Sequence, residues 1–148
     1  MNMRMNYRKA SPATLQAMMT LEQHTSGRIE DKVLVELIKI RVSQINGCAF
    51  CVDIHTKDLM KMGDYWNHIV LLSVWREAPL FTQEQRVALE LAEAVTLISE
   101  NGVSDDVFER VREQFGEIGV IDLVMVINTI NNWNRIAITT GMFPGCLE

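Results

Sequence analysis

The stretch VELIKIRVSQINGCAFCVDIHTKDLMKMG, residues 35–63, decides the fold, because it holds two amphipathic helical segments with a glycine between them. Apolar residues recur at intervals of three and four before Gly47 and again after it, which is the period of an α-helix. We expect one helix over about residues 30–46 and a second from about residue 48 to 62, with Gly47 ending the first. The stretch therefore predicts a helical hairpin with a Cys-x-x-Cys motif at its turn.

The rest of the chain also reads as helices with short stops between them and little strand-like alternation. Ser11 before a proline, Thr82 three residues before a glutamine, and Ser104 before two aspartates are helix-starting patterns. The expected helices cover about residues 12–27, 65–75, 83–101, 105–115 and 118–140. With the hairpin these make about seven helices, which predicts an all-α fold in a single domain spanning residues 1–148.

The composition argues against several classes of protein. The net charge is −5 and the 14 lysines and arginines are scattered, so no basic stripe is present for nucleic acid. The N-terminus lacks the apolar run of a secretory signal, which predicts a cytoplasmic protein. The longest apolar stretch, residues 118–141, contains Asp122 and Arg135, which are costly at membrane depth, so we expect a buried helix and no membrane contact. Such apolar helices also predict a homo-oligomer.

A charge on that apolar helix needs a partner if it is buried. We therefore expect Arg135 to pair with a carboxylate such as Glu90 or Glu93, within the chain or between subunits.

The chemistry is carried by the Cys-x-x-Cys motif and the residues around it. Cys48 and Cys51 fall in the first turn of a helix, where unpaired backbone N–H groups favour a thiolate and can lower a cysteine pKa from about 8.5. His55 follows Cys51 by four residues and Cys48 by seven, so we expect all three on one helix face. Glu36 lies on the preceding helix, and the hairpin can bring its carboxylate toward His55 or the thiols. The set matches a nucleophile, a base and a group that orients the base.

Metal binding by the same residues is the rival hypothesis. Cys48, Cys51 and His55 supply three zinc ligands, and Glu36 or the remote Cys146 would have to supply the fourth. No second Cys-x-x-Cys or histidine pair is present, so we expect no metal. Cys146, near the C-terminus, is expected to be a bystander.

The spacing of Glu36, Cys48, Cys51 and His55 resembles the core motif, here residues 36–55, of the AhpD-like alkylhydroperoxidases in the carboxymuconolactone decarboxylase superfamily. The resemblance extends over roughly residues 30–141 and includes TQEQRVALELAEAVTLIS and NTINNWNRIAITTG. It implies an all-helical AhpD-like fold, a homotrimer or a hexamer, and peroxidase activity without metal or flavin cofactors.

The resemblance also assigns roles. Cys51 is expected to attack the peroxide, Cys48 to resolve the sulfenic acid into a disulfide, and His55 with Glu36 to relay protons. A dithiol partner, such as a lipoyl protein, a thioredoxin or a small thiol, is expected to reduce the disulfide. Some members carry a histidine directly before the second cysteine, whereas this chain has Phe50, which removes one relay group.

Three alternatives stay open from the sequence. The chain could be a disulfide oxidoreductase, or a noncatalytic helical oligomer that senses redox state or binds zinc. The decarboxylase branch of the superfamily lacks the Cys-x-x-Cys motif, so Cys48 and Cys51 count against that activity.

Overall fold

The computed structural model describes residues 1–148 and contains helices and no strands, which confirms the all-α fold class. Its elements in chain order are α1 (Tyr7–Ala10), α2 (Pro12–Gly27), α3 (Lys32–Asn46), α4 (Ala49–Lys61), α5 (Trp66–Leu71), the 3₁₀ helix η1 (Leu72–Glu77), α6 (Gln83–Thr96), α7 (Ile98–Asn101) and α8 (Asp105–Thr140). None of these helices combines the length and the apolar character that crossing a lipid bilayer would need.

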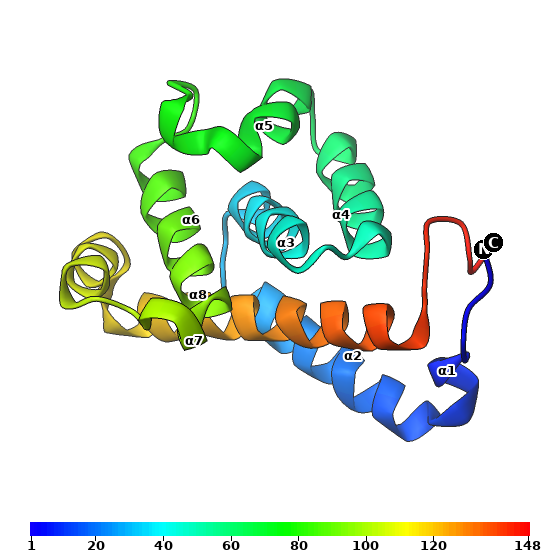
Figure 1. Ribbon diagram of the computed structural model, residues 1–148. Coiled ribbons are helices and arrows are strands. Elements are labelled where there is room, and N and C mark those ends of the chain that lie inside the picture. Colours follow the sequence, from blue (N-terminus) through cyan, green and yellow to red (C-terminus); the bar gives the residue numbers. More distant parts are fainter.

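Helix α3 lies in the middle of the molecule and packs against α4, α6 and α8 (Figure 1). Its residues Leu37, Ile38 and Ile40 are fully buried, as expected for a helix that is covered on several sides. Helix α2 runs along the C-terminal half of α8 (Figure 1). The N-terminal segment meets the end of α8, where Arg4 and Met5 donate to the carbonyl of Thr140. This arrangement places the α3–α4 hairpin over the junction of α2 and α8.

The predicted capping residues confirm most of the predicted helix starts. The Ser11 hydroxyl accepts from the backbone of α2, the Ser104 hydroxyl accepts from that of α8, and Thr82 and Gln85 form a reciprocal capping box on α6. Gly47 ends α3 in the left-handed conformation at φ 72°, which a residue with a side chain rarely adopts. The chain can therefore reverse immediately before the first cysteine.

The break expected between residues 115 and 118 is confirmed: Gly116, at φ 71°, kinks α8 and divides it into two arms. The structure differs from the predicted helices in two other places. The helix expected over residues 65–75 is a short α-helix followed by the 3₁₀ turn η1, which is kinked at Val74. Residues 97–101 break away from α6 as the separate turn α7.

A partly buried carboxylate, Glu93 on α6, joins α3, η1 and α6. Its oxygens accept from Arg41 Nε at 2.9 Å, Trp75 Nε1 at 2.9 Å and Arg76 at 2.6 Å. Burial alone would raise the pKa of Glu93, but the hydrogen bonds from these three donors outweigh it and lower the pKa below the usual 4.5. The expected pairing of Arg135 with this carboxylate or with Glu90 within the chain is wrong, because Arg135 is exposed on α8 and pairs with neither.

Asparagines of α8 fix the end of α3. Asn46 Nδ2 donates to Asn131 Oδ1 at 2.9 Å and to Asn134 Oδ1 at 3.0 Å, and Asn134 donates to the hydroxyl of Ser43 at 2.9 Å. Asn134 is fully buried, so these bonds satisfy amide groups that would otherwise be costly to bury. The asparagines of the NTINNWN stretch therefore anchor the turn that carries the cysteines.

Candidate active site

The two cysteines lie at the very start of α4. Cys48 is the N-cap residue, with extended backbone angles, and its sulfur accepts the backbone N–H of Cys51 at 3.3 Å. Cys51 is the third residue of the helix, and the two sulfurs are joined as a disulfide across a Cα–Cα distance of 5.3 Å. Both cysteines are almost fully buried, at 2% and 4% exposure. The motif is therefore a disulfide set at the positive end of a helix dipole.

Glu36 of α3 reaches His55 of α4 across the hairpin. The Glu36 Oε2 atom and the His55 Nδ1 atom are 2.8 Å apart, and both side chains are largely shielded from water. A carboxylate at Nδ1 holds the proton of a neutral imidazole on that nitrogen, which leaves Nε2 as the acceptor. The structure thus brings together the pair that the sequence proposed as base and orienting group.

A buried lysine extends this pair into a longer charge network, which the sequence analysis missed. Lys39 is only 4% exposed, and its ammonium lies 3.7 Å from Glu36 Oε1 and donates to Glu22 of α2. Glu22 also accepts from Ser26 at 2.9 Å and from Trp133 Nε1 at 3.1 Å. Burial raises the pKa of Glu22, but the attraction of Lys39 and the hydrogen bonds to Glu22 lower the pKa by more than burial raises it. The net shift is therefore downward.

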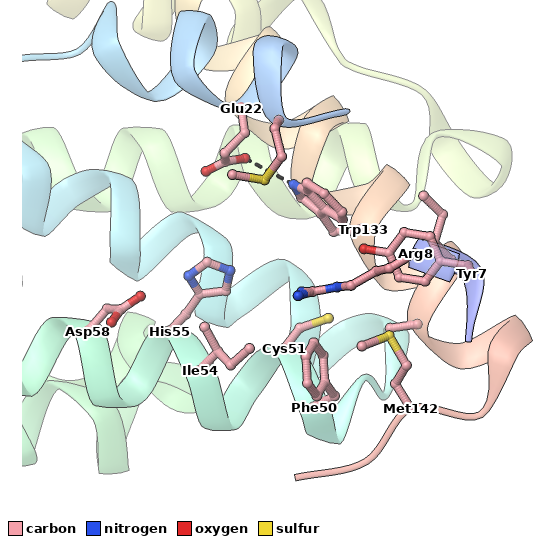
Figure 2. Close-up of a pocket in the computed structure, with 13 residues that line it drawn as sticks. Tyr7, Arg8, Glu22, Phe50, Cys51, Ile54, His55, Asp58, Trp133 and Met142 are labelled. Carbon is pink, nitrogen blue, oxygen red and sulfur yellow. Dashed lines mark hydrogen bonds between the residues drawn. The ribbon is translucent and has the colours of Figure 1, made fainter. Parts of the chain in front are cut away.

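Cys51 and His55 face one cavity of about 290 Å³ between α1, α2, α4 and α8 (Figure 2). Its wall is mostly apolar and includes Phe50, Ile54, Trp133, Ile136 and Met142. Polar side chains also reach it, namely Tyr7, Arg8, Glu22 and Asp58. A small apolar cavity with a few converging polar groups is typical of a site for a small molecule.

Cys48 faces a different hollow, which differs from the expectation that all three residues share one helix face. That hollow is an open groove of about 640 Å³ on the other side of α4, lined by Cys48, Val52, Thr56 and Ile69 among others. The physical reason is that Cys48 is outside the helix as its cap, so the seven-residue spacing to His55 does not align the two side chains. The disulfide therefore joins a sulfur on the cavity to a sulfur on the groove.

The acidic and histidine side chains near the cavity could in principle bind a metal ion. One ligand atom each from Glu36, His55 and Asp58 lies within 4.8 Å of the others. However, the His55–Glu36 hydrogen bond already uses the facing atoms, and the Lys39 ammonium beside Glu36 repels a cation. The zinc set suggested by the sequence is not assembled either, because Cys48 and Cys51 are bonded to each other. The geometry fits a proton relay better than a metal site.

Residues 12–94 match the model of the carboxymuconolactone decarboxylase family. The chain belongs to this family. The match includes the α3–α4 hairpin with Glu36, both cysteines and His55, and it confirms the resemblance seen in the sequence.

Two bacterial proteins resemble this chain over most of its length. The uncharacterized protein YdfG of Bacillus subtilis (strain 168) is 45% identical over 141 residues, which cover 95% of this chain and 96% of YdfG. The crystal structure of ATU0492 from Agrobacterium tumefaciens, a protein of unknown function proposed as the antioxidant defence protein AhpD, superposes with a TM-score of 0.92 at 42% identity, covering 97% of this chain and 99% of that one.

A more distant structure has the same fold. An uncharacterized peroxidase-related protein from Silicibacter sp. TM1040 gives a TM-score of 0.79 at 27% identity, over 90% of this chain and 71% of its own. The AhpD-like helical fold predicted from the sequence is thereby confirmed.

Proposed function

We propose that this chain is a thiol peroxidase that reduces hydrogen peroxide or organic hydroperoxides through Cys51 and Cys48, without a metal or a flavin. The observation that carries the proposal is the shared cavity: Cys51 and His55 line one small apolar space, while Cys51 is bonded to a second cysteine that can resolve it. The antioxidant description of ATU0492 supports the same chemistry.

The first step uses the cavity side of the disulfide pair. In the reduced protein, His55 Nε2 accepts the proton of the Cys51 thiol, and Glu36 stabilises the imidazolium through Nδ1–H. The thiolate attacks the outer oxygen of the hydroperoxide, so that an S–O bond forms and the O–O bond breaks. The leaving alkoxide takes the proton back from His55 and departs as an alcohol, or as water when the substrate is hydrogen peroxide.

The second and third steps regenerate the thiols. The Cys48 thiol attacks the sulfur of the Cys51 sulfenic acid, the disulfide forms, and the hydroxyl leaves as water with the proton of Cys48. A dithiol reductant then attacks the disulfide and is itself oxidised, returning both cysteines to thiols. Because Cys48 borders an open groove, we propose that the reductant, a lipoyl protein, a thioredoxin or a small thiol, approaches from that side.

We further propose a cytoplasmic homo-oligomer, a trimer or a hexamer. Dithiol reductants keep cysteines reduced in that compartment. Large apolar side chains on the surface of this chain support association, including Ile118 at 70% and Ile121 at 62% exposure on α8 and Trp66 at 60% on α5.

A second activity has one observation in its favour. The groove beside Cys48 would also suit exchange with the disulfide of another protein, so disulfide oxidoreduction is the alternative function. The two functions differ in the oxidant: the peroxidase forms its disulfide with peroxide alone, whereas the oxidoreductase needs a second disulfide.

The deciding experiment is stopped-flow oxidation of the reduced protein by hydrogen peroxide and by cumene hydroperoxide. We expect one internal disulfide to form much faster than a free thiol reacts, Cys51→Ser to be inert, and Cys48→Ser to accumulate sulfenic acid. Cys146→Ser is the matched control, and we expect it to behave as the wild type. If neither peroxide reacts faster than a free thiol, the peroxidase function is wrong.

A further inference from the structure

One cation at the cavity has no counter-ion. Arg8 of α1 lines the same cavity as Cys51, and Figure 2 shows its guanidinium pointing inward, below Trp133 and toward Cys51 and His55. The side chain makes no hydrogen bond and no ion pair, although a guanidinium carries five donors. Arg8 is exposed, so water solvates part of its guanidinium, but its direction places an unpaired positive charge beside the cavity that Cys51 lines.

The other charged groups around Cys51 are already paired. From α2 and α3, Glu22 and Glu36 share the single ammonium of Lys39. From α4, the ring of His55 is bound to Glu36. Asp58, also on α4, accepts from Lys61 at 2.7 Å. The α8 wall adds no charge, since it consists of Trp133, Ile136, Ala137 and Met142.

These charges create a problem for a thiolate in the cavity. Two carboxylates against one ammonium leave the buried network with a net negative charge, which disfavours a second anion nearby. The start of α4 favours the thiolate through its backbone N–H groups, and Arg8 is the one cation on the cavity that is free to do the same.

We propose that Arg8 is an activating residue of the reaction, whose guanidinium stabilises the Cys51 thiolate before it attacks the peroxide. This inference rests on the proposed role of Cys51 as the attacking sulfur. When the disulfide forms, the anion disappears and the guanidinium is left without a partner, which is the state that the structure presents.

The N-terminal segment is fixed well enough to place Arg8. The backbone N–H groups of Arg4 and Met5 both donate to the carbonyl of Thr140 at the end of α8, at 2.9 and 3.3 Å. Tyr7 is 8% exposed, and the side chain of Asn6 caps the short helix α1. This segment precedes residue 12, where the match to the family model begins, so the contribution of Arg8 lies outside the shared motif.

The test is the thiolate titration of Cys51, followed by absorbance at 240 nm against pH in reduced full-length protein carrying Cys48→Ser and Cys146→Ser. An opposite charge near a thiol lowers its pKa by about 1 to 3 units, so we expect Arg8→Met to raise the titration midpoint by about one unit. Arg8→Lys keeps the charge and should restore most of the shift. Lys9→Met removes a neighbouring charge of α1 that does not line the cavity, and should leave the midpoint unchanged.

Each other outcome overturns the inference. An unchanged midpoint in Arg8→Met excludes a role for the charge. An equal rise in Arg8→Lys assigns the effect to shape, and an equal rise in Lys9→Met assigns it to the general charge of the segment. The titration uses no peroxide, so a protein with the Arg8-dependent shift but no peroxide reaction would refute the proposed function, whereas the stabilisation of the Cys51 thiolate by Arg8 would still hold.

Discussion

Replacing Lys39 by methionine would test the charge network that supports His55. The substitution keeps a long apolar side chain of similar size, but it removes the only ammonium between Glu22 and Glu36. We expect a large loss of stability, because two carboxylates in a mostly buried site would face each other without a cation.

The magnitude follows from the burial and the distances. The side chain of Lys39 is 5% exposed, that of Glu36 10% and that of Glu22 21%. At an effective dielectric constant of about 20, unit charges 3.7 Å apart attract each other by about 4 kcal/mol. Breaking a buried ion pair by removing one partner costs about 3–5 kcal/mol in measured cases. Since Glu22 is partly solvated, we expect Lys39→Met to lower the free energy of unfolding by about 3 kcal/mol.

The assay is urea unfolding followed by circular dichroism, at one protein concentration for all variants because an oligomer is stabilised by mass action. The matched control is Lys57→Met, which breaks an exposed pair with Asp53 and should change the free energy of unfolding very little. The double variant Lys39→Met/Glu22→Met should recover part of the loss, because it leaves a single buried carboxylate bound to His55. Equal effects of Lys39→Met and Lys57→Met would refute the reasoning.

Three further predictions concern the relay, the pH dependence and the assembly. Glu36→Gln should slow peroxide-driven disulfide formation by about 100-fold in stopped-flow traces, since His55 loses the carboxylate that stabilises its imidazolium. The folded-state pKa of Glu93 is lowered, so the contribution of this carboxylate to stability is complete above about pH 4.5 and is lost as the pH falls through the lowered value. Urea unfolding should therefore show Glu93→Gln about 2 kcal/mol less stable than the wild type at pH 7. At the lowest pH at which both proteins fold, their free energies of unfolding should be nearly equal. Ile121→Glu should lower the molar mass measured by light scattering if the exposed α8 residues form the subunit interface, and an unchanged mass would place that interface elsewhere.

The fold was predictable from local signals because capping residues and glycines mark most of the helix ends in the sequence. Ser11, Thr82 and Ser104 cap the helices that the sequence assigned to them, and Gly47 ends α3 where expected. The break between residues 115 and 118 was also expected, and Gly116 kinks α8 there. The break at residue 97 was harder to place, because it interrupts a run with helical periodicity, and tertiary packing rather than local propensity decides whether such a run stays straight.

Only the part of the site that lies on the α3–α4 hairpin was predictable from the sequence. Glu36 and His55 lie on consecutive helices around Gly47, so their contact follows from the turn. Lys39 is three residues from Glu36 on one helix face and could have been noticed, but its second partner, Glu22, comes from another element and has no spacing signal. The predicted pairing of Arg135 was wrong because an apolar stretch does not reveal which residues of its helix face solvent.

The proposed order of the two cysteines rests on where the helix begins. A spacing of four residues aligns two side chains only when both are inside the helix, as Cys51 and His55 are, whereas Cys48 has extended backbone angles and lies outside. His55 is therefore in register with Cys51 alone, and both line the apolar cavity. In thioredoxin-type motifs the first cysteine is usually the exposed, acidic one, but here the first cysteine caps the helix, accepts the N–H of the second, and borders the groove on the far side. The asymmetry of one helix N-terminus thus supports attack by Cys51 from the cavity and resolution by Cys48 toward the groove.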